Sequence, residues 1–177
     1  MIAALAIVAF VALERLAELA ISLRNTRALM ARGAIEHGAK HYPAIVALHL
    51  AWLASLILFL PRPVALYWPW LAAFAMLQVL RIWVMTSLGE WFSTRILTIE
   101  DAPLVETGLY RYLRHPNYWI VVGEIASLPL AFGEIWVALA FTLLNAAALA
   151  WRIRIEDGAL ASRRAAGANR TSNILSR

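Results

Sequence analysis

The chain has 177 residues, 62% of them hydrophobic and only 15% charged, whereas a soluble domain usually carries about 25% charged residues, so we predict a membrane protein. It has no cysteine, which excludes disulfide scaffolds, thiolate nucleophiles and cysteine-based zinc sites. The formal charge of +5 does not indicate a nucleic-acid partner, because the arginines lie between apolar runs, as in cytoplasmic loops of membrane proteins.

Five segments are predicted as membrane spans, for which a helix needs about 20 mostly apolar residues. They are Met1 to Leu23, Tyr42 to Leu60, Val64 to Met85, Tyr118 to Phe132, and Ile135 to Trp151. A tight turn at Gly133 and Glu134 joins the last two, so these should form a helical hairpin. We therefore expect an all-α integral membrane protein with about five transmembrane helices in one domain, residues 1–160. The polar residues 161–177 should form a frayed cytoplasmic tail.

The first predicted span contains three ionisable residues. Glu14 and Glu18 share a helix face, and Arg15 lies three residues from Glu18. Ionisable groups inside a membrane are functional by default. The sequence leaves two hypotheses open, namely contact with a substrate and a structural polar contact with Gln78 and Arg81 of the third span.

Lysine and arginine residues cluster in three segments, which predicts the orientation. These segments are the loop from Arg24 to His41, the loop from Thr86 to His115, and the residues from Arg152 onward. With five spans they all fall on one side of the membrane, and the other side keeps only Arg62. The positive-inside rule then predicts a protein of the cell membrane whose amino terminus is outside and whose carboxyl terminus is cytoplasmic.

Three histidines in the first half of the chain are candidates for metal binding or for hydrogen bonds between helices. His37 and His41 are four residues apart with Glu36 adjacent. This spacing is not that of a zinc protease and it includes a glycine, so we predict no metal site. His49, inside the second predicted span, should form an interhelical hydrogen bond.

The richest polar chemistry lies in the sequence GLYRYLRHPNYWIVVGE, residues 108–124. Arg111, Arg114 and His115 are cations or a titratable base beside a low-dielectric wall, and Pro116 disfavours helix at the residue before it. The two arginines could equally bind lipid headgroups. This stretch therefore indicates a polar site or a membrane anchor at the start of the fourth span.

A second polar cluster lies at the inner end of the last span. Arg152 and Glu156 are four residues apart on one helix face, with Asp157 beside them. Alone, this pattern could be a helix-end salt bridge. The predicted topology brings it to the same membrane side as His115, so the two polar clusters should converge. The intervening loop, Thr86 to His115, should be extended or turn structure.

These two clusters resemble the isoprenylcysteine carboxyl methyltransferase family, integral-membrane enzymes that use S-adenosylmethionine. The resemblance lies in GLYRYLRHPNY at Gly108 to Tyr118 and RIRIEDGAL at Arg152 to Leu160. It is specific in the Arg-His-Pro-x-Tyr core and the Arg-x-x-x-Glu pair, and covers roughly the carboxyl-terminal half. The amino-terminal half is more similar to a bacterial branch whose acceptors include alkylpyrones and phenolic lipids.

The resemblance implies a cytoplasmic cofactor pocket formed by the loop before the fourth helix and the end of the last helix. It assigns S-adenosylmethionine binding to Ala102, Pro103, Leu104, Val105, Tyr110, His115, Pro116, Asn117, Tyr118 and Glu156. Arg152 would orient the acceptor, and His115 is also a candidate base. In two places the sequence departs from the family pattern: Asp157 replaces a second glutamate, and residues 119–121 lack a glycine often found there.

Methyl transfer from a sulfonium is an in-line displacement that needs no metal and depends on positioning and the exclusion of water. Glu156 can counter the positive cofactor, and Arg152 can orient an acidic oxygen. We therefore predict S-adenosylmethionine-dependent O-methylation of a carboxylate or an enolic or phenolic hydroxyl on a lipophilic, membrane-partitioned acceptor. The alternatives are a small-thiol S-methyltransferase and a non-catalytic transporter or adaptor. The sequence leaves the oligomeric state open.

Overall fold

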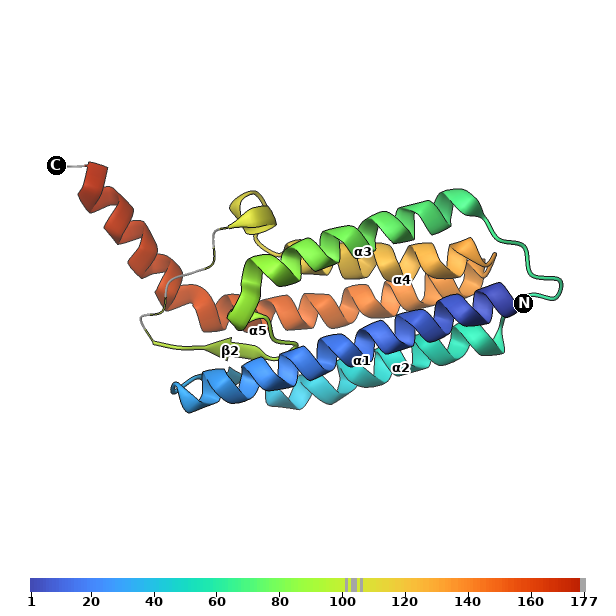
Figure 1. The fold of residues 1–177 in the computed structure, drawn as a ribbon. Helices are drawn as coiled ribbons and strands as arrows, with labels where there is room; N and C mark the ends of the chain where they lie inside the picture. Colours follow the sequence, from blue (N-terminus) through green and yellow to red (C-terminus); the bar gives the residue numbers. More distant parts are fainter. Residues whose placement is uncertain (101, 103–104, 106, 176–177) are drawn as a thin grey trace.

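The computed structural model describes the chain except residues 101, 103, 104, 106, 176 and 177, and describes side chains as far as Ala161. Its frame is a set of long helices that lie along one axis and run in alternating directions (Figure 1). They are α1 (Ile2–Ala31), α2 (Tyr42–Leu58), α3 (Trp68–Leu88), α4 (Pro116–Ala131) and α5 (Ile135–Leu175). The predicted hairpin of the last two spans is confirmed as α4 and α5.

Within the described residues, three helical segments have the length and apolar composition of a membrane span. They are Ala39–Leu58, Trp68–Trp91 and Ile135–Ala161. The protein is thus mostly helical, and three of its five predicted spans are confirmed by these criteria. The remaining helices differ because α4 has only 16 residues and α1 carries charged residues at its middle. That α1 and α4 also cross the membrane stays a prediction.

One face of α1 packs against the rest of the molecule. Its buried residues recur at intervals of three, four or seven positions, as on one face of a helix: Ala4, Val8, Val11, Glu18, Ser22, Asn25 and Leu29. The apolar part of this face joins the core, which also includes Trp52 of α2 and Ile125 of α4. The second half of the face is polar, and it contacts the segment after α3.

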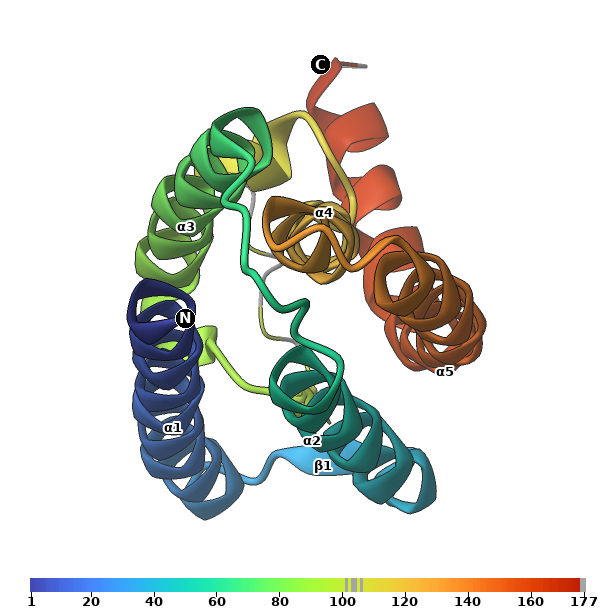
Figure 2. The same cartoon turned by 90° about the vertical axis from the view of Figure 1, so that its right-hand side faces the viewer.

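Helix α4 lies between α3 and α5 (Figure 2). A Cβ atom at Gly123 would lie 2.7 Å from Cδ1 of Leu77 in α3, so the absence of a side chain allows the two helices to approach closely. Ile120, in the stretch where the family pattern has a glycine, is instead buried in the helix packing. The glycine that allows α3 and α4 to pack closely is Gly123.

A buried ionic cluster joins α1, α3 and α4; it consists of Arg15, Glu18, Gln78, Arg81 and Glu124. Arg81 donates to Glu18 at 2.7 Å and to Glu124 at 3.0 Å. Arg15 also donates to Glu18 at 2.9 Å and to Glu124 at 3.1 Å, and Gln78 donates to Glu124 at 3.0 Å. The structural polar contact with Gln78 and Arg81 is confirmed for Arg15 and Glu18, with Glu124 as an additional member. Each carboxylate is paired, as charges this deeply buried require. Glu14 lies 3.6 Å from Arg15, and its Oε2 has no hydrogen-bond partner among the described residues.

A two-stranded antiparallel sheet lies at one end of the helices. Strand β1 (Ile35–His37) pairs with β2 (Ile96–Thr98), with Ile35 opposite Thr98 and His37 opposite Ile96. The all-α expectation was wrong here, because strands of three residues are too short to show an alternating pattern in the sequence. The expected extended loop between α3 and α4 also contains two 3-10 helices, η2 (Gly89–Trp91) and η3 (Gly108–Arg111).

The chain after residue 160 differs from the frayed tail that its polarity predicted, because α5 continues to Leu175. This stretch is rich in alanine and arginine, residues with high helix propensity, which favour a helix even without an apolar period. Similarly, α1 extends beyond the predicted end at Leu23 to Ala31. The change from apolar to polar residues therefore marks where an apolar stretch ends, but the helix itself continues beyond that point.

The histidines of the first half have separate surroundings. Nε2 of His37 lies 2.8 Å from Oγ1 of Thr98, across the two-stranded sheet. His41, in the short helix η1 (Ala39–His41), is 2% exposed. Nδ1 of His49 donates to the carbonyl oxygen of Ile45 at 2.8 Å. The interhelical bond predicted for His49 was wrong, because the main-chain carbonyl one turn earlier in α2 serves as the acceptor.

Candidate functional site

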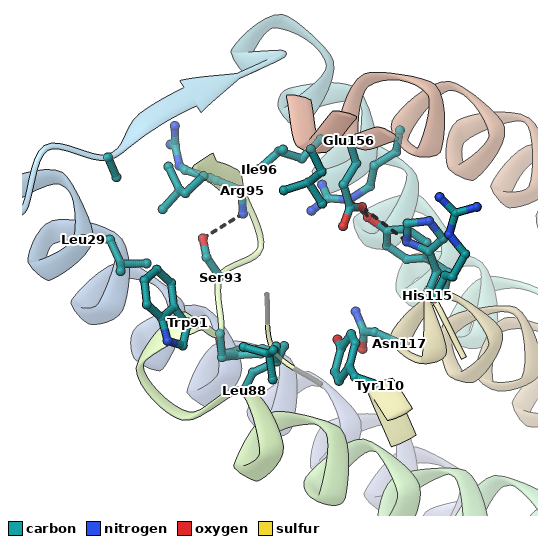
Figure 3. Close-up of a pocket in the computed structure, with 18 of the residues that line it drawn as sticks. Leu29, Leu88, Trp91, Ser93, Arg95, Ile96, Tyr110, His115, Asn117 and Glu156 are labelled. Atoms are coloured by element: carbon teal, nitrogen blue, oxygen red, sulfur yellow. Dashed lines mark hydrogen bonds and ion pairs between the residues drawn. The ribbon is translucent and has the colours of Figure 1, made fainter. Parts of the chain in front are cut away.

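A cavity of about 350 Å³ lies at the end of the molecule where α3 ends and α4 begins. Its volume is within the range of about 300–1,000 Å³ that is usual for small-molecule sites. In Figure 3, His115, Asn117 and Glu156 lie across the cavity from Leu29 and Trp91, while Leu88 and Tyr110 lie near each other at its lower side. The cavity therefore has a polar side and an apolar side.

The polar side is formed where α4 starts. Pro116 is the first residue of α4, and His115 before it has φ −136° and ψ 59°, outside the helical region as expected for a residue before proline. His115, Asn117 and Tyr118 all line the cavity. A short, conformationally restricted stretch thus supplies three of the polar side chains.

Tyr118 of α4 links Arg152 and Glu156 of α5. Nε of Arg152 donates to the Tyr118 hydroxyl at 2.8 Å, and this hydroxyl donates to the carboxylate of Glu156. The helix-end salt bridge considered from the sequence is thus bridged by a tyrosine from another helix. Because Arg152 is buried, this contact fixes the plane of its guanidinium group.

His115 contacts the same group of residues. Its ring stacks on that of Tyr118, with centroids 5.3 Å apart and planes at 14°. Its Nδ1 lies 3.7 Å from Glu156, and its Nε2 lies 3.4 Å from Asp157. Asp157 is also 3.9 Å from the exposed Arg114. The aspartate that replaces the family's second glutamate therefore holds His115 from the side of α5.

A glycine turn places Tyr110. Gly108 has φ +58°, and a Cβ there would lie 2.2 Å from Oγ of Ser87, so only glycine allows η3 to pack against the end of α3. Tyr110 in η3 lines the cavity. Burial raises the pKa of its hydroxyl, so Tyr110 stays neutral. By contrast, Arg111 is exposed, as a headgroup-binding residue would be.

The apolar side comes from elements far apart in the sequence. Its residues are Leu29, Ala34, Leu88, Trp91, Phe92, Ile96, Leu97 and Ile99. Arg95 also lines the cavity, but its Nη1 lies 2.7 Å and 2.9 Å from the two carboxylate oxygens of Glu36, and its guanidinium lies 4.7 Å from the Tyr42 ring centroid. Six of the eight apolar residues lie between Leu88 and Ile99, and only Leu29 and Ala34 come from the first part of the chain. Sequence reasoning missed this side because its apolar residues look like ordinary core residues. The spacing of buried residues on α1, which ends at Leu29, is the signal that points to it.

Most residues assigned by resemblance meet at this cavity. Those that line it are Val105, Tyr110, His115, Asn117, Tyr118, Arg152 and Glu156. Pro116 is buried at the start of α4, and Ala102 lies in the described part of the loop without lining the cavity. Pro103 and Leu104 lie outside the described residues. The role of each residue stays a prediction.

A sequence model of the isoprenylcysteine carboxyl methyltransferase family matches residues 70–162, which is more than half of the chain. The chain belongs to the isoprenylcysteine carboxyl methyltransferase family. The matched region contains α3 from its third residue, all of α4, and the part of α5 that carries Arg152 and Glu156. The protein is therefore a membrane methyltransferase, and members of this family use S-adenosylmethionine as the methyl donor.

Two bacterial relatives match most of the chain. The chain is 35% identical over 158 residues to the uncharacterized protein YpbQ of Bacillus subtilis, which covers 87% of this chain and 94% of that protein. It is 26% identical over 151 residues to an uncharacterized protein of Haemophilus influenzae, covering 82% and 88% of the two chains. No solved structure matches. The relatives thus extend the similarity to α1 and α2, outside the family match.

Proposed function

We propose that this methyltransferase transfers the methyl group of S-adenosylmethionine to an acidic oxygen of a lipophilic acceptor that partitions into the bilayer. The acceptor oxygen belongs to a carboxylate or to an enolic or phenolic hydroxyl. The observation that carries this proposal is the division of one cavity into a polar side, with Arg152 and Glu156, and an apolar side. The cofactor and the acceptor can then meet without leaving the cavity.

The residues of the polar side fit S-adenosylmethionine. Oδ1 of Asn117 is buried and has no hydrogen-bond partner among the described residues, so a ligand N–H group would satisfy it. Glu156 provides a carboxylate for a cationic ligand. Neutral Tyr110 and the stacked rings of His115 and Tyr118 provide flat surfaces for a heterocycle. These residues, with Val105, would hold the cofactor.

When bound, S-adenosylmethionine supplies a methyl group on a cationic sulfur, and transfer breaks the carbon–sulfur bond and forms a carbon–oxygen bond to the acceptor. Arg152 would bind the acceptor oxygen through its terminal nitrogens, while the Nε contact with Tyr118 holds the guanidinium in place. An acceptor that arrives ionised needs no base. For an acceptor that arrives protonated, we assign His115 as the base.

The proposed function includes a membrane orientation. We propose that α1 and α4 complete five spans, so that the cavity opens toward the cytoplasm and the amino terminus lies outside. The basic segments around residues 24–41 and from Arg152 onward lie at the cavity end of the helices (Figure 1), as the positive-inside rule requires for a cytoplasmic face. Residues 1–160 would form the enzyme and residues 161–177 a cytoplasmic extension.

A methyl-transfer assay tests this function. Purified protein is supplied with tritium-methyl S-adenosylmethionine and a panel containing alkylpyrones, alkylresorcinols, a prenylcysteine analogue and a small thiol. We expect the lipophilic oxygen acceptors to be labelled, with apparent affinity rising by up to about 0.8 kcal/mol for each added methylene that is buried. Turnover of the water-soluble thiol at an equal rate would contradict the proposed acceptor class.

The Arg152→Lys variant separates acceptor binding from cofactor binding. Lysine keeps the charge but loses the planar pair of donors, so we expect the methylation rate to fall while cofactor affinity, measured by calorimetry, stays near the wild-type value. Arg154→Lys, at an exposed position of the same helix, is the matched control. An unchanged rate in Arg152→Lys would assign this arginine to helix packing.

A further inference from the structure

The polar half of the α1 face holds residues 89–95, which contribute Trp91 and Phe92 to the apolar side of the cavity. Nδ2 of Asn25 donates to two main-chain carbonyl oxygens, those of Gly89 and Phe92, both at 3.0 Å. Asn25 is buried, and the carbonyls lie at the start of η2 and just after it. One side chain therefore fixes both ends of the turn that carries Trp91.

Ser22 makes a second attachment one turn earlier. The main-chain N–H of Thr94 donates to Oγ of Ser22 at 2.8 Å, and the hydroxyl groups of these two residues are 2.9 Å apart. Oγ1 of Thr26 also lies 3.0 Å from Oγ of Ser93. Because Ser22 is buried, these bonds cannot be replaced easily by water. Segment 89–95 is thus attached to α1 along its length.

The same helix face then enters the cavity. Ser22, Asn25 and Leu29 are spaced by three and four residues, and all are buried. Leu29 lines the cavity together with Trp91 and Phe92 of the attached segment. All of α1 lies outside the family match, which begins at residue 70. An element outside the matched region therefore shapes one side of the site.

We propose that α1 selects the acceptor: Ser22 and Asn25 are positioning residues for segment 89–95, and Leu29 sets the space available to an alkyl chain. This inference rests on the proposed function. The cofactor side is expected to be unaffected, because its polar groups come from η3, α4 and α5. An apolar chain is the occupant that matches a side formed mainly by leucine, isoleucine, tryptophan and phenylalanine, where Arg95 is already paired with Glu36.

Cysteine labelling can test this inference without turnover, because the chain has no cysteine of its own. Ser93→Cys places one thiol in the cavity lining. The probes are pentylresorcinol and pentadecylresorcinol, and the measurement is the rate of maleimide labelling in detergent. We expect the long-chain probe to protect the thiol at roughly tenfold lower concentration than the short-chain probe, because it buries more methylenes.

Variants of α1 in the Ser93→Cys background then test the protection ratio, which is the concentration of the short-chain probe needed for protection divided by that of the long-chain probe. We expect Leu29→Ala to reduce this ratio by about fivefold. Leu16→Ala, which removes the same atoms from a position that is 62% exposed on the same helix, should leave it unchanged. Asn25→Ala and Ser22→Ala should raise the rate at which the thiol is labelled in the absence of a probe. In Ser22→Thr, which keeps the hydroxyl, this rate should stay near that of the Ser93→Cys parent.

Calorimetry with S-adenosylhomocysteine completes the test. Its affinity should stay within about twofold of the parent value in Leu29→Ala, because that change leaves the polar side intact. Equal protection ratios in Leu29→Ala and Leu16→Ala would overturn this inference, as would equal protection by both probes in the parent. Neither result would contradict the proposed function. If the parent shows the expected protection but binds no S-adenosylhomocysteine, the proposed function fails while α1 remains the chain-selecting element.

Discussion

Glu156 of α5 accepts a hydrogen bond from the hydroxyl of Tyr118 in α4, 38 positions earlier in the chain. The same hydroxyl accepts a bond from Nε of Arg152, one turn before Glu156 on α5. A neutral group thus stands between a cation and an anion and contacts both. Substitutions at Tyr118 and Glu156 should therefore have distinguishable effects.

Glu156→Gln should weaken binding of S-adenosylmethionine more than binding of S-adenosylhomocysteine, because only the first carries a positive sulfur. Loss of a charge-assisted contact costs about 1.5–3 kcal/mol, which is roughly a 10- to 150-fold loss of affinity. Calorimetry with both ligands measures the difference, with Glu90→Gln at an exposed carboxylate as the control. Unchanged cofactor affinity in both Glu156→Ala and His115→Ala would contradict the site assignment.

Tyr118→Phe should lower the methylation rate by roughly tenfold or more while the protein stays folded. Phenylalanine keeps the ring that stacks on His115, but it removes the hydroxyl that contacts Arg152 and Glu156, and hydrogen bonds to charged groups contribute about 1.5–3 kcal/mol each. Steady-state rates at saturating cofactor measure the effect. The control is Tyr112→Phe, because Tyr112 is 75% exposed, and equal rates in the two variants would show that the hydroxyl is dispensable.

Arg81→Leu should destabilise the protein by about 3–5 kcal/mol, because it leaves Glu18 and Glu124 buried with fewer counter-charges. Thermal unfolding in detergent measures the loss. Arg32→Ala is the matched control: it removes an ion pair of 2.8 Å with Glu90 on the exposed surface, which should cost less than about 1 kcal/mol. A similar cost for both variants would mean that the ionic cluster is hydrated.

Glu134 should make stability depend on pH. It is 5% exposed, and in the described part of the structure its carboxylate oxygens have no hydrogen-bond partner. Burial raises its pKa from an ordinary 4.5 to about 7. Between these values the unfolded chain loses the proton while the folded protein keeps it, so stability falls as pH rises from about 4.5 to about 7, by at most about 3 kcal/mol, and then levels off.

Glu134→Gln should remove this dependence and be more stable than the wild type above about pH 7. Thermal unfolding of both proteins in the same detergent at pH values across the window measures the effect. Parallel profiles for the two proteins would show that Glu134 is ionised and solvated in the folded state.

Two single-cysteine variants should report the orientation. Arg62 precedes α3, and Arg27 lies near the end of α1; both are exposed. On intact cells, a membrane-impermeant maleimide should label Arg62→Cys, and it should label Arg27→Cys only after the membrane is opened. The reverse result, or labelling of both from outside, would refute an outside amino terminus.

The grouping of the polar residues at one cavity could be predicted from the sequence because these residues are contiguous or one helix turn apart. Tyr110, His115, Asn117 and Tyr118 fall within one stretch of nine residues, and a single helix face carries Arg152 with Glu156. Residues that are close in the chain or one turn apart are close in space whatever the rest of the fold does. Resemblance to a family then supplied the roles that the spacing alone left open.

The apolar side could not be predicted in the same way. Leu29 meets Trp91 and Ile96 only because α1 packs against the segment that carries η2 and β2, and each of these residues alone looks like an ordinary core residue. Glu124 lies in an apolar run of the sequence, but its pairing with Arg81 depends on the packing of α3 against α4. Long-range contacts of this kind have no local pattern.

The pairing of β1 with β2 restricts the number of residues between the end of α3 and β2. Side chains alternate across a strand, so a shift of one residue would turn buried Ile96 to the opposite face of the sheet. Upstream, Gly89, Phe92 and Thr94 are each held by a side chain of α1. The stretch from the end of α3 to β2 is therefore a spacer of fixed length, so inserting or deleting one residue should displace the side chains that it contributes to the cavity.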